Sequence, residues 1–89
     1  MNQTDSGKLR TNRIPLVQDL DANDVLDYLF QEHILFDEDV QEIKSKPVRQ
    51  DRTRKLLDVL PCRGPKAFQT FVVALRQTPG TVHLADLLS

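Results

Sequence analysis

Apolar side chains recur along the chain at helical spacing, and no segment shows the sustained alternation of apolar and polar residues that a half-buried strand requires. The clearest stripe falls in segment 65–78, at positions i, i+3, i+4 and i+7, and consists of Phe68, Phe71, Val72 and Leu75. This spacing places the side chains on one face of a helix. The pattern predicts an all-α fold with this helix at the centre of the core.

The first helix of the chain contains a proline. We expect this helix to begin after Asp5 or Ser6, either of which can cap free amide groups, and to end near Leu20. Pro15 lacks an N–H group and crowds the carbonyl four residues back, so it should bend the helix or split it near residues 11–14. Residues 1–7 are accordingly interpreted as an N-terminal tail and residues 8–89 as the domain.

Four more helices are marked by capping residues at their starts or by prolines at their ends, which makes six in all. They cover about residues 22–32, 38–46, 48–60 and 82–88. The expected caps are Asp21, Asp37 and Thr81. Besides the central stripe, the residues available for burial are Leu9, Leu16, Val17, Leu20, Val25, Leu26, Leu29, Phe30, Val40, Ile43, Val48, Leu56, Leu57, Leu60, Leu84, Leu87 and Leu88.

The length of 89 residues indicates one domain with a modest core. The apolar fraction of 39% and charged fraction of 28% are typical of a soluble protein, and no apolar run approaches the roughly 18 residues that a membrane span needs. The start of the chain lacks the features of a signal peptide, and Cys62 is the only cysteine. A reducing, cytoplasmic location is therefore expected, with no membrane partner.

Charge is segregated along the chain although the net charge is only −1. Segment 19–42 holds nine acidic residues and no Lys or Arg, whereas segment 44–66 holds eight basic residues and two acidic ones. Ordinary soluble surfaces intersperse the two signs, so a merely solvated surface is the weaker interpretation. Two single-sign patches on one domain favour association through charge pairing.

Candidate chemistry is sparse. Cys62, His33 and His83 lack the paired spacing of a zinc site, so no metal is expected. Cys62 is better explained as a small, partly buried residue at a helix junction than as a nucleophile. Gly64 has no glycine neighbours that could form a phosphate-binding loop. We therefore expect neither catalysis nor a cofactor.

Nucleic-acid binding is an alternative, because four basic residues cluster in the predicted helix at positions 49–55. The dense acidic segment would repel a polyanion, and no aromatic side chain lies among the basic ones to stack on bases. Protein association is the favoured interpretation, with no nucleic-acid partner expected.

Three passages carry a resemblance to a known family: DVLDYL at 24–29, TRKLLDVLP at 53–61 and RGPKAF at 63–68. They resemble caspase recruitment domains of the death-fold superfamily over about residues 8–88, most closely those of initiator caspases and of an adaptor that recruits one. The resemblance implies a six-helix antiparallel Greek-key bundle with a kinked first helix. It also implies no catalytic activity and no cofactor.

The same resemblance implies a homotypic interaction module that recruits or clusters caspases or adaptors in apoptotic or inflammatory signalling. Its partner would be another caspase recruitment domain, including a second copy in a helical oligomer, and a decoy that inhibits such assembly is an alternative. Basic positions on one domain would contact acidic positions on another. The matching basic residues are Arg10, Arg13, Arg49, Arg52 and Arg54, and the acidic candidates are Asp24, Asp27, Asp37, Glu38, Asp39 and Glu42.

Overall fold

The computed structural model describes all residues from 1 to 89 and contains helices and turns but no strand. Six helices were expected, whereas the structure has seven α-helices and one short 3-10 helix, because the first predicted helix is divided. The elements are α1 (Gln3–Thr11), α2 (Arg13–Asp19), α3 (Asn23–Gln31), α4 (Asp37–Ser45), α5 (Arg49–Val59), η1 (Leu60–Cys62), α6 (Ala67–Gln77) and α7 (Val82–Leu88).

The division of the first helix lies at Asn12, three residues before Pro15. The first backbone hydrogen bond of α2 runs from the Leu16 N–H to the Asn12 carbonyl, over 3.1 Å. Pro15 is the third residue of α2, where an N–H group would have no partner within the helix, so the ring costs α2 nothing. Of the two outcomes expected near residues 11–14, a bend or a split, the structure shows the split, and α1 and α2 take the place of one helix.

Several helix starts differ from the expected ones. Asn2 caps α1 by accepting a 2.8 Å hydrogen bond from the Asp5 N–H, so α1 begins at Gln3, within the segment interpreted as a tail. Phe36, and not Asp37, occupies the cap position of α4. Asp39 accepts the Phe36 N–H in the manner of half a capping box. Cap choice depends on the turn before each helix, which periodicity does not report.

One cluster of 23 buried apolar residues forms the core, with Phe71 of α6 fully enclosed in it. Three residues expected to pack there are exposed instead: Val48, Phe30 and Leu87. Val48 is exposed because it precedes the first turn of α5. Within α5, the buried residue Thr53 donates its hydroxyl hydrogen to the Leu20 carbonyl and so joins α5 to α2. Phe30 and Leu87 lie beside the apolar stripes of α3 and α7 rather than on them.

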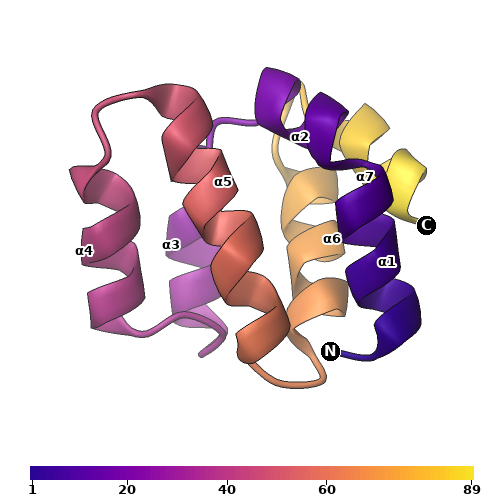
Figure 1. Cartoon of the computed structure of the whole chain (residues 1–89), viewed down its shortest axis with the longest axis horizontal. Coiled ribbons are helices and arrows are strands. Elements are labelled where there is room, and N and C mark those ends of the chain that lie inside the picture. The colour runs from indigo at the N-terminus through magenta and orange to yellow at the C-terminus, as the bar shows by residue number, and fades with distance from the viewer.

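The helices form a bundle in which α1 and α4 lie at opposite ends (Figure 1). Helix α4 runs upward and α5 returns downward beside it, while α6 packs against both α3 and α7. Helix α2 lies across the upper end of the bundle, and the turn between α3 and α4 lies at the lower left (Figure 1). The acidic segment and the basic segment are therefore neighbours, because α4 packs beside α5.

Candidate interaction surface

The surface has three open hollows, of about 460, 370 and 240 Å³, each lined by at least one charged side chain. Cys62 is exposed, and no group of three or more His, Cys, Asp or Glu side chains is placed to hold a metal ion. No helix is both long and apolar enough to cross a membrane. The chemistry of the surface therefore lies in its charged and apolar patches.

Three of the five predicted basic residues form a continuous exposed patch over α1, α2 and α5. Arg10 and Arg13 line the hollow of 370 Å³, and Arg13 and Arg54 line the hollow of 240 Å³ beside Ile14. Arg13 forms a 3.2 Å ion pair with Asp58, and Arg54 forms a 2.8 Å pair with Asp51. Both pairs are exposed, so they hold the arginines weakly and leave them free to exchange partners. We call Arg10, Arg13 and Arg54 the basic patch.

The other two predicted arginines hold the fold together. The Arg49 guanidinium donates to the carbonyls of Gln18 and Leu20, over 2.8 and 3.1 Å, at the C-terminal end of α2. Arg52 donates to the Lys46 carbonyl over 2.9 Å and closes the turn before α5. A cation bound to free carbonyls at the C-terminal end of a helix also interacts favourably with the negative end of the helix dipole. Because their guanidinium groups are bound to backbone carbonyls, Arg49 and Arg52 do not belong to the basic patch.

Four of the six predicted acidic residues are exposed and form no ion pair within the chain. Asp24 and Asp27 lie on α3, and Asp37 and Glu38 lie in the first turn of α4. Glu42 is exposed but pairs with Lys55 over 3.0 Å. The carboxylates in the first turn of α4 are also stabilised by the positive end of the dipole of that helix. We call Asp24, Asp27, Asp37 and Glu38 the acidic patch.

Asp39 does not belong to an exposed acidic face, which corrects the prediction made for it. Only 7% of Asp39 is exposed, and its two carboxylate oxygens accept from the Nη2 and Nε of Arg63 over 2.7 and 2.8 Å. Its Oδ2 also accepts the Phe36 N–H over 3.0 Å. The hydrogen bonds from Arg63 lower the pKa of the Asp39 carboxyl, and the carboxylate in turn raises the pKa of Arg63. This bidentate pair joins α4 to the turn before α6.

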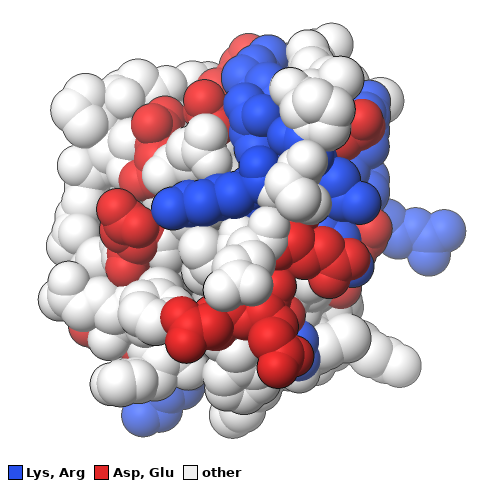
Figure 2. Space-filling model, turned by 90° about the vertical axis from the view of Figure 1, so that its left-hand side faces the viewer, with Lys and Arg blue, Asp and Glu red and all other residues white.

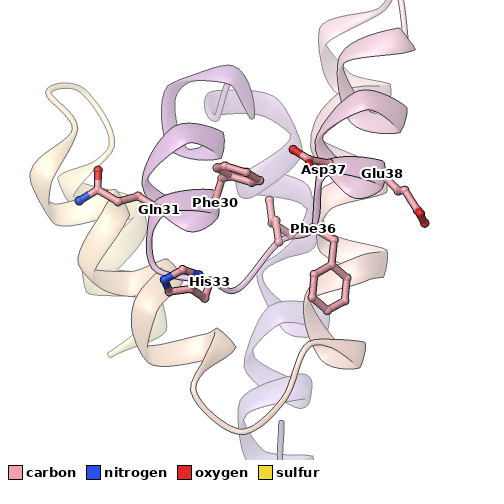
Figure 3. A pocket seen from close by; sticks show the side chains of 7 residues that line it. Phe30, Gln31, His33, Phe36, Asp37 and Glu38 are labelled. Atoms are coloured by element: carbon pink, nitrogen blue, oxygen red, sulfur yellow. The ribbon is translucent and has the colours of Figure 1, made fainter.

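Sequence patterns missed the apolar part of this surface. Phe30 and Phe36 are exposed and line the hollow of 460 Å³ together with Leu35. Its polar lining consists of Gln31, His33, Asp37 and Glu38, of which Asp37 points toward Phe30 and Glu38 extends away from it (Figure 3). The Arg63 guanidinium lies 5.0 Å from the centre of the Phe36 ring. One signal in the sequence indicates this exposure: Phe36 directly precedes the acidic start of α4 and belongs to no apolar stripe.

The side of the molecule that carries α4 shows how charge is distributed (Figure 2). The largest group of Lys and Arg atoms lies in the upper half and a large group of Asp and Glu atoms lies in the lower half, while further acidic atoms lie at the upper and middle left (Figure 2). The main basic group and the main acidic group thus occupy different parts of this face, a property suited to directional association.

An all-helical bundle with exposed, segregated charge defines a small protein-interaction module. The model of the caspase recruitment domain family matches residues 7–89, and the chain belongs to that family. The domain that defines this family is a protein-interaction module and not a catalytic domain.

Two curated relatives support the assignment. The chain is 31% identical over 80 residues to caspase-2 of Gallus gallus, a match that covers 90% of this chain and 19% of the relative. It is 34% identical over 77 residues to the CARD domain-containing protein E10 of equine herpesvirus 2 (strain 86/87), covering 85% of this chain and 24% of the relative. The chain thus spans 19% and 24% of the lengths of these relatives.

Proposed function

We propose that the chain recruits or clusters a caspase or an adaptor by docking its basic patch on the acidic patch of another caspase recruitment domain, or the reverse. The observation that carries this proposal is the exposed acidic patch, in which four carboxylates have no ion-pair partner in their own chain. Unpaired like charges repel one another and are relieved by a cationic partner.

The proposed docking is directional because the two patches lie in different regions of one domain. Such a contact is heterologous, so it can repeat and build a ring or a helical oligomer. Each exposed ion pair contributes only about 0.2 to 1 kcal/mol, so a single contact should be weak and sensitive to salt. Clustering of many copies would raise the local concentration of attached effectors. A cytoplasmic location belongs to the same proposal, and the exposed, unpaired Cys62 is compatible with it.

The contacts of α5 favour a protein partner over a nucleic acid. Arg49 and Arg52 donate to backbone carbonyls, while Arg54 and Lys55 pair with acidic residues of the chain. The ion pairs of Arg54 and Lys55 can exchange for other partners, but Arg49 and Arg52 are held by backbone carbonyls, so two of the four cations counted toward a phosphate-binding helix already serve contacts within the fold. Binding of phosphates would have to replace these contacts.

Binding to the matched segment of chicken caspase-2, measured by fluorescence anisotropy as the salt concentration is raised, tests the proposal. We expect weaker binding at higher salt and a loss of about tenfold or more for Asp37→Lys and for Arg10→Glu. Lys66→Glu is the control for Arg10→Glu, because Lys66 is exposed and lies outside both patches. Unchanged binding by both patch variants, or no binding of the wild type at any salt concentration, would contradict the proposed recruitment.

A further inference from the structure

Ser6 is the one serine of the chain whose hydroxyl is not bound to a backbone carbonyl. The hydroxyls of the other two, Ser45 and Ser89, donate to the carbonyls of Glu42 and Ala85 over 2.6 and 2.9 Å. Ser6 is partly exposed in α1 and lines the hollow of 370 Å³. Its hydroxyl is therefore available at the surface, and the other lining residues decide which chemistry fits there.

Two arginines line the same hollow. Arg10 follows Ser6 by four residues in α1, so the two side chains lie on the same face of the helix, and Arg10 forms no ion pair within the chain. Arg13 lies 3.2 Å from Asp58, with 39% and 61% of the two side chains exposed. An ion pair so exposed contributes little to stability and exchanges readily. The hollow thus presents two cations beside one available hydroxyl.

We propose that Ser6 is a phosphorylation site and that its phosphate binds Arg10 and Arg13 in this hollow. A serine kinase transfers the γ-phosphoryl group of a nucleoside triphosphate: the Ser6 Oγ bonds to phosphorus, the bond from phosphorus to the β-phosphate oxygen breaks, the nucleoside diphosphate leaves, and the hydroxyl proton passes to the base of the kinase. The product has a charge of about −1.5 to −2 at pH 7 and three acceptor oxygens. Guanidinium groups bind such an acceptor in bidentate fashion, so Arg13 exchanges Asp58 for the phosphate.

The helix around Ser6 favours both the reaction and its product. Leu9 is the only buried residue of α1, so this helix opens at a small cost in free energy and exposes the hydroxyl to a kinase. Lys8 and Arg10 follow Ser6 by two and four residues, a pattern that suits a kinase with an acidic substrate groove. Ser6 is also the fourth residue of α1, near the positive end of the helix dipole, which stabilises an anion.

This inference rests on the proposed function and adds its regulation. The basic patch consists of Arg10, Arg13 and Arg54, and the charge of the phosphate offsets most of the positive charge of the first two. The acidic patch lies on α3 and α4 and keeps its charge. A phosphorylated copy therefore accepts the basic patch of another domain but no longer offers its own. Phosphorylation switches off one of the two directions of docking and leaves the other.

Labelling with a kinase tests the modification site itself. The full 89-residue chain is incubated with ATP and a purified serine kinase that prefers basic residues after its target, and mass spectrometry of the peptides locates the phosphate. We expect phosphate on Ser6 and none at this position in Ser6→Ala, with circular dichroism melts showing that the variant is folded. Phosphate confined to other hydroxyls, or no phosphate at all, overturns Ser6 as a modification site.

The pairing with the arginines has a readout of its own, the second pKa of the phosphate, which is about 6 for free phosphoserine. Phosphorus NMR of the chain with phosphoserine at position 6 should give a lower pKa in the folded state than in urea, because the two cations favour the dianion. The double variant Arg10→Gln, Arg13→Gln should return the pKa to about 6. Phosphothreonine at position 4 is the matched control, since Thr4 is exposed on the same helix and lies outside the hollow. A pKa equal to that in urea overturns binding of the phosphate in the hollow.

Binding to the matched segment of chicken caspase-2 separates this inference from the proposed function. We expect phosphoserine at position 6 to weaken binding about tenfold or more, as Arg10→Glu does, and phosphothreonine at position 4 to change it less than about twofold. If phosphoserine at position 6 leaves binding unchanged, the regulatory role is wrong. Charge docking still stands in that case if Arg10→Glu or Asp37→Lys weakens binding, and it fails if neither does.

Discussion

The basic and acidic regions of this domain differ in what their side chains contact. On the basic side, Arg49 and Arg52 donate to backbone carbonyls and hold helix ends and turns in place. On the acidic side, Asp37 and Glu38 project from the first turn of α4 without an ion pair. The chain therefore uses part of its positive charge for its own fold, whereas the acidic patch remains available to a partner.

This difference decides which substitutions report on binding. A reversal such as Arg52→Glu removes the contacts that close the turn before α5, so lost binding by that variant would not separate docking from folding. Reversals at Arg10 or Asp37 change exposed charges alone. Four predictions sharpen the comparison, from the largest expected effect to the smallest.

The largest effect lies in the core beneath both regions. Phe71→Ala removes a fully buried aromatic ring and should lower the free energy of unfolding by about 3 to 5 kcal/mol, which approaches the whole stability of a small domain. Urea denaturation measures the loss, with the exposed Val73→Ala on the same helix as the control. A melt near that of the wild type would show that Phe71 is not enclosed.

The second effect concerns Asp39, the predicted acidic-patch residue that the structure places in a buried ion pair. Asp39→Asn weakens the bidentate pair with Arg63 and should cost about 2 to 3 kcal/mol. Because the pKa of Asp39 is lowered in the folded state, its contribution is complete above the pKa of the unfolded chain, near 3.9, and is lost as the pH falls through the lower folded value. Denaturation between about pH 5 and 2 should therefore show a steeper loss for the wild type than for Asp39→Asn. Equal slopes would contradict the assigned role.

The third effect compares two arginines of the same helix. Arg49→Met keeps the aliphatic stem but loses two hydrogen bonds to the end of α2, so it should lower the free energy of unfolding by about 1 to 2 kcal/mol. Arg54→Met breaks only an exposed pair and should change it by about 0.5 kcal/mol or less. Equal losses in thermal melts would remove the distinction between structural and exposed arginines.

The smallest effect concerns the backbone of the acidic end. His33 follows α3 with a φ of 62°, and the next amide, that of Ile34, donates to the Leu29 carbonyl over 2.9 Å in a Schellman arrangement. Glycine adopts this φ without strain, so His33→Gly should raise the free energy of unfolding by up to about 1 kcal/mol. His33→Ala is the control, because it keeps the Cβ atom. A destabilised glycine variant would mean that the imidazole contributes more than the backbone strain.

Sequence patterns were most reliable where one helix face had to meet the core. Leu9, Leu16, Val17 and Leu20 were all expected to be buried, and all are. The apolar stripe of α6 was likewise correct for Phe71. Burial of apolar area is a strong and additive effect, so it leaves a periodic trace in the chain.

The contacts of charged side chains could not be predicted in the same way. Asp39 and Asp37 are both acidic residues at the start of α4, yet only Asp39 meets Arg63, which is 24 residues away in the chain. Nor could residue type distinguish Arg49, which joins α5 to α2, from Arg54, which is exposed. Such pairings depend on where the helices pack.

The sequence by itself determined that this chain is helical, that it has one core and that its charges are segregated, because propensity, periodicity and composition are local properties. It also carried the passages that resemble caspase recruitment domains. Only the tertiary structure decided that Asp39 is buried while Asp37 is free. Only it decided that Ile14 lies within the basic patch and Phe36 within the acidic end. Those outcomes depend on the packing of helices distant in sequence, where a hydrogen bond or an exposed face exists only after the bundle has formed.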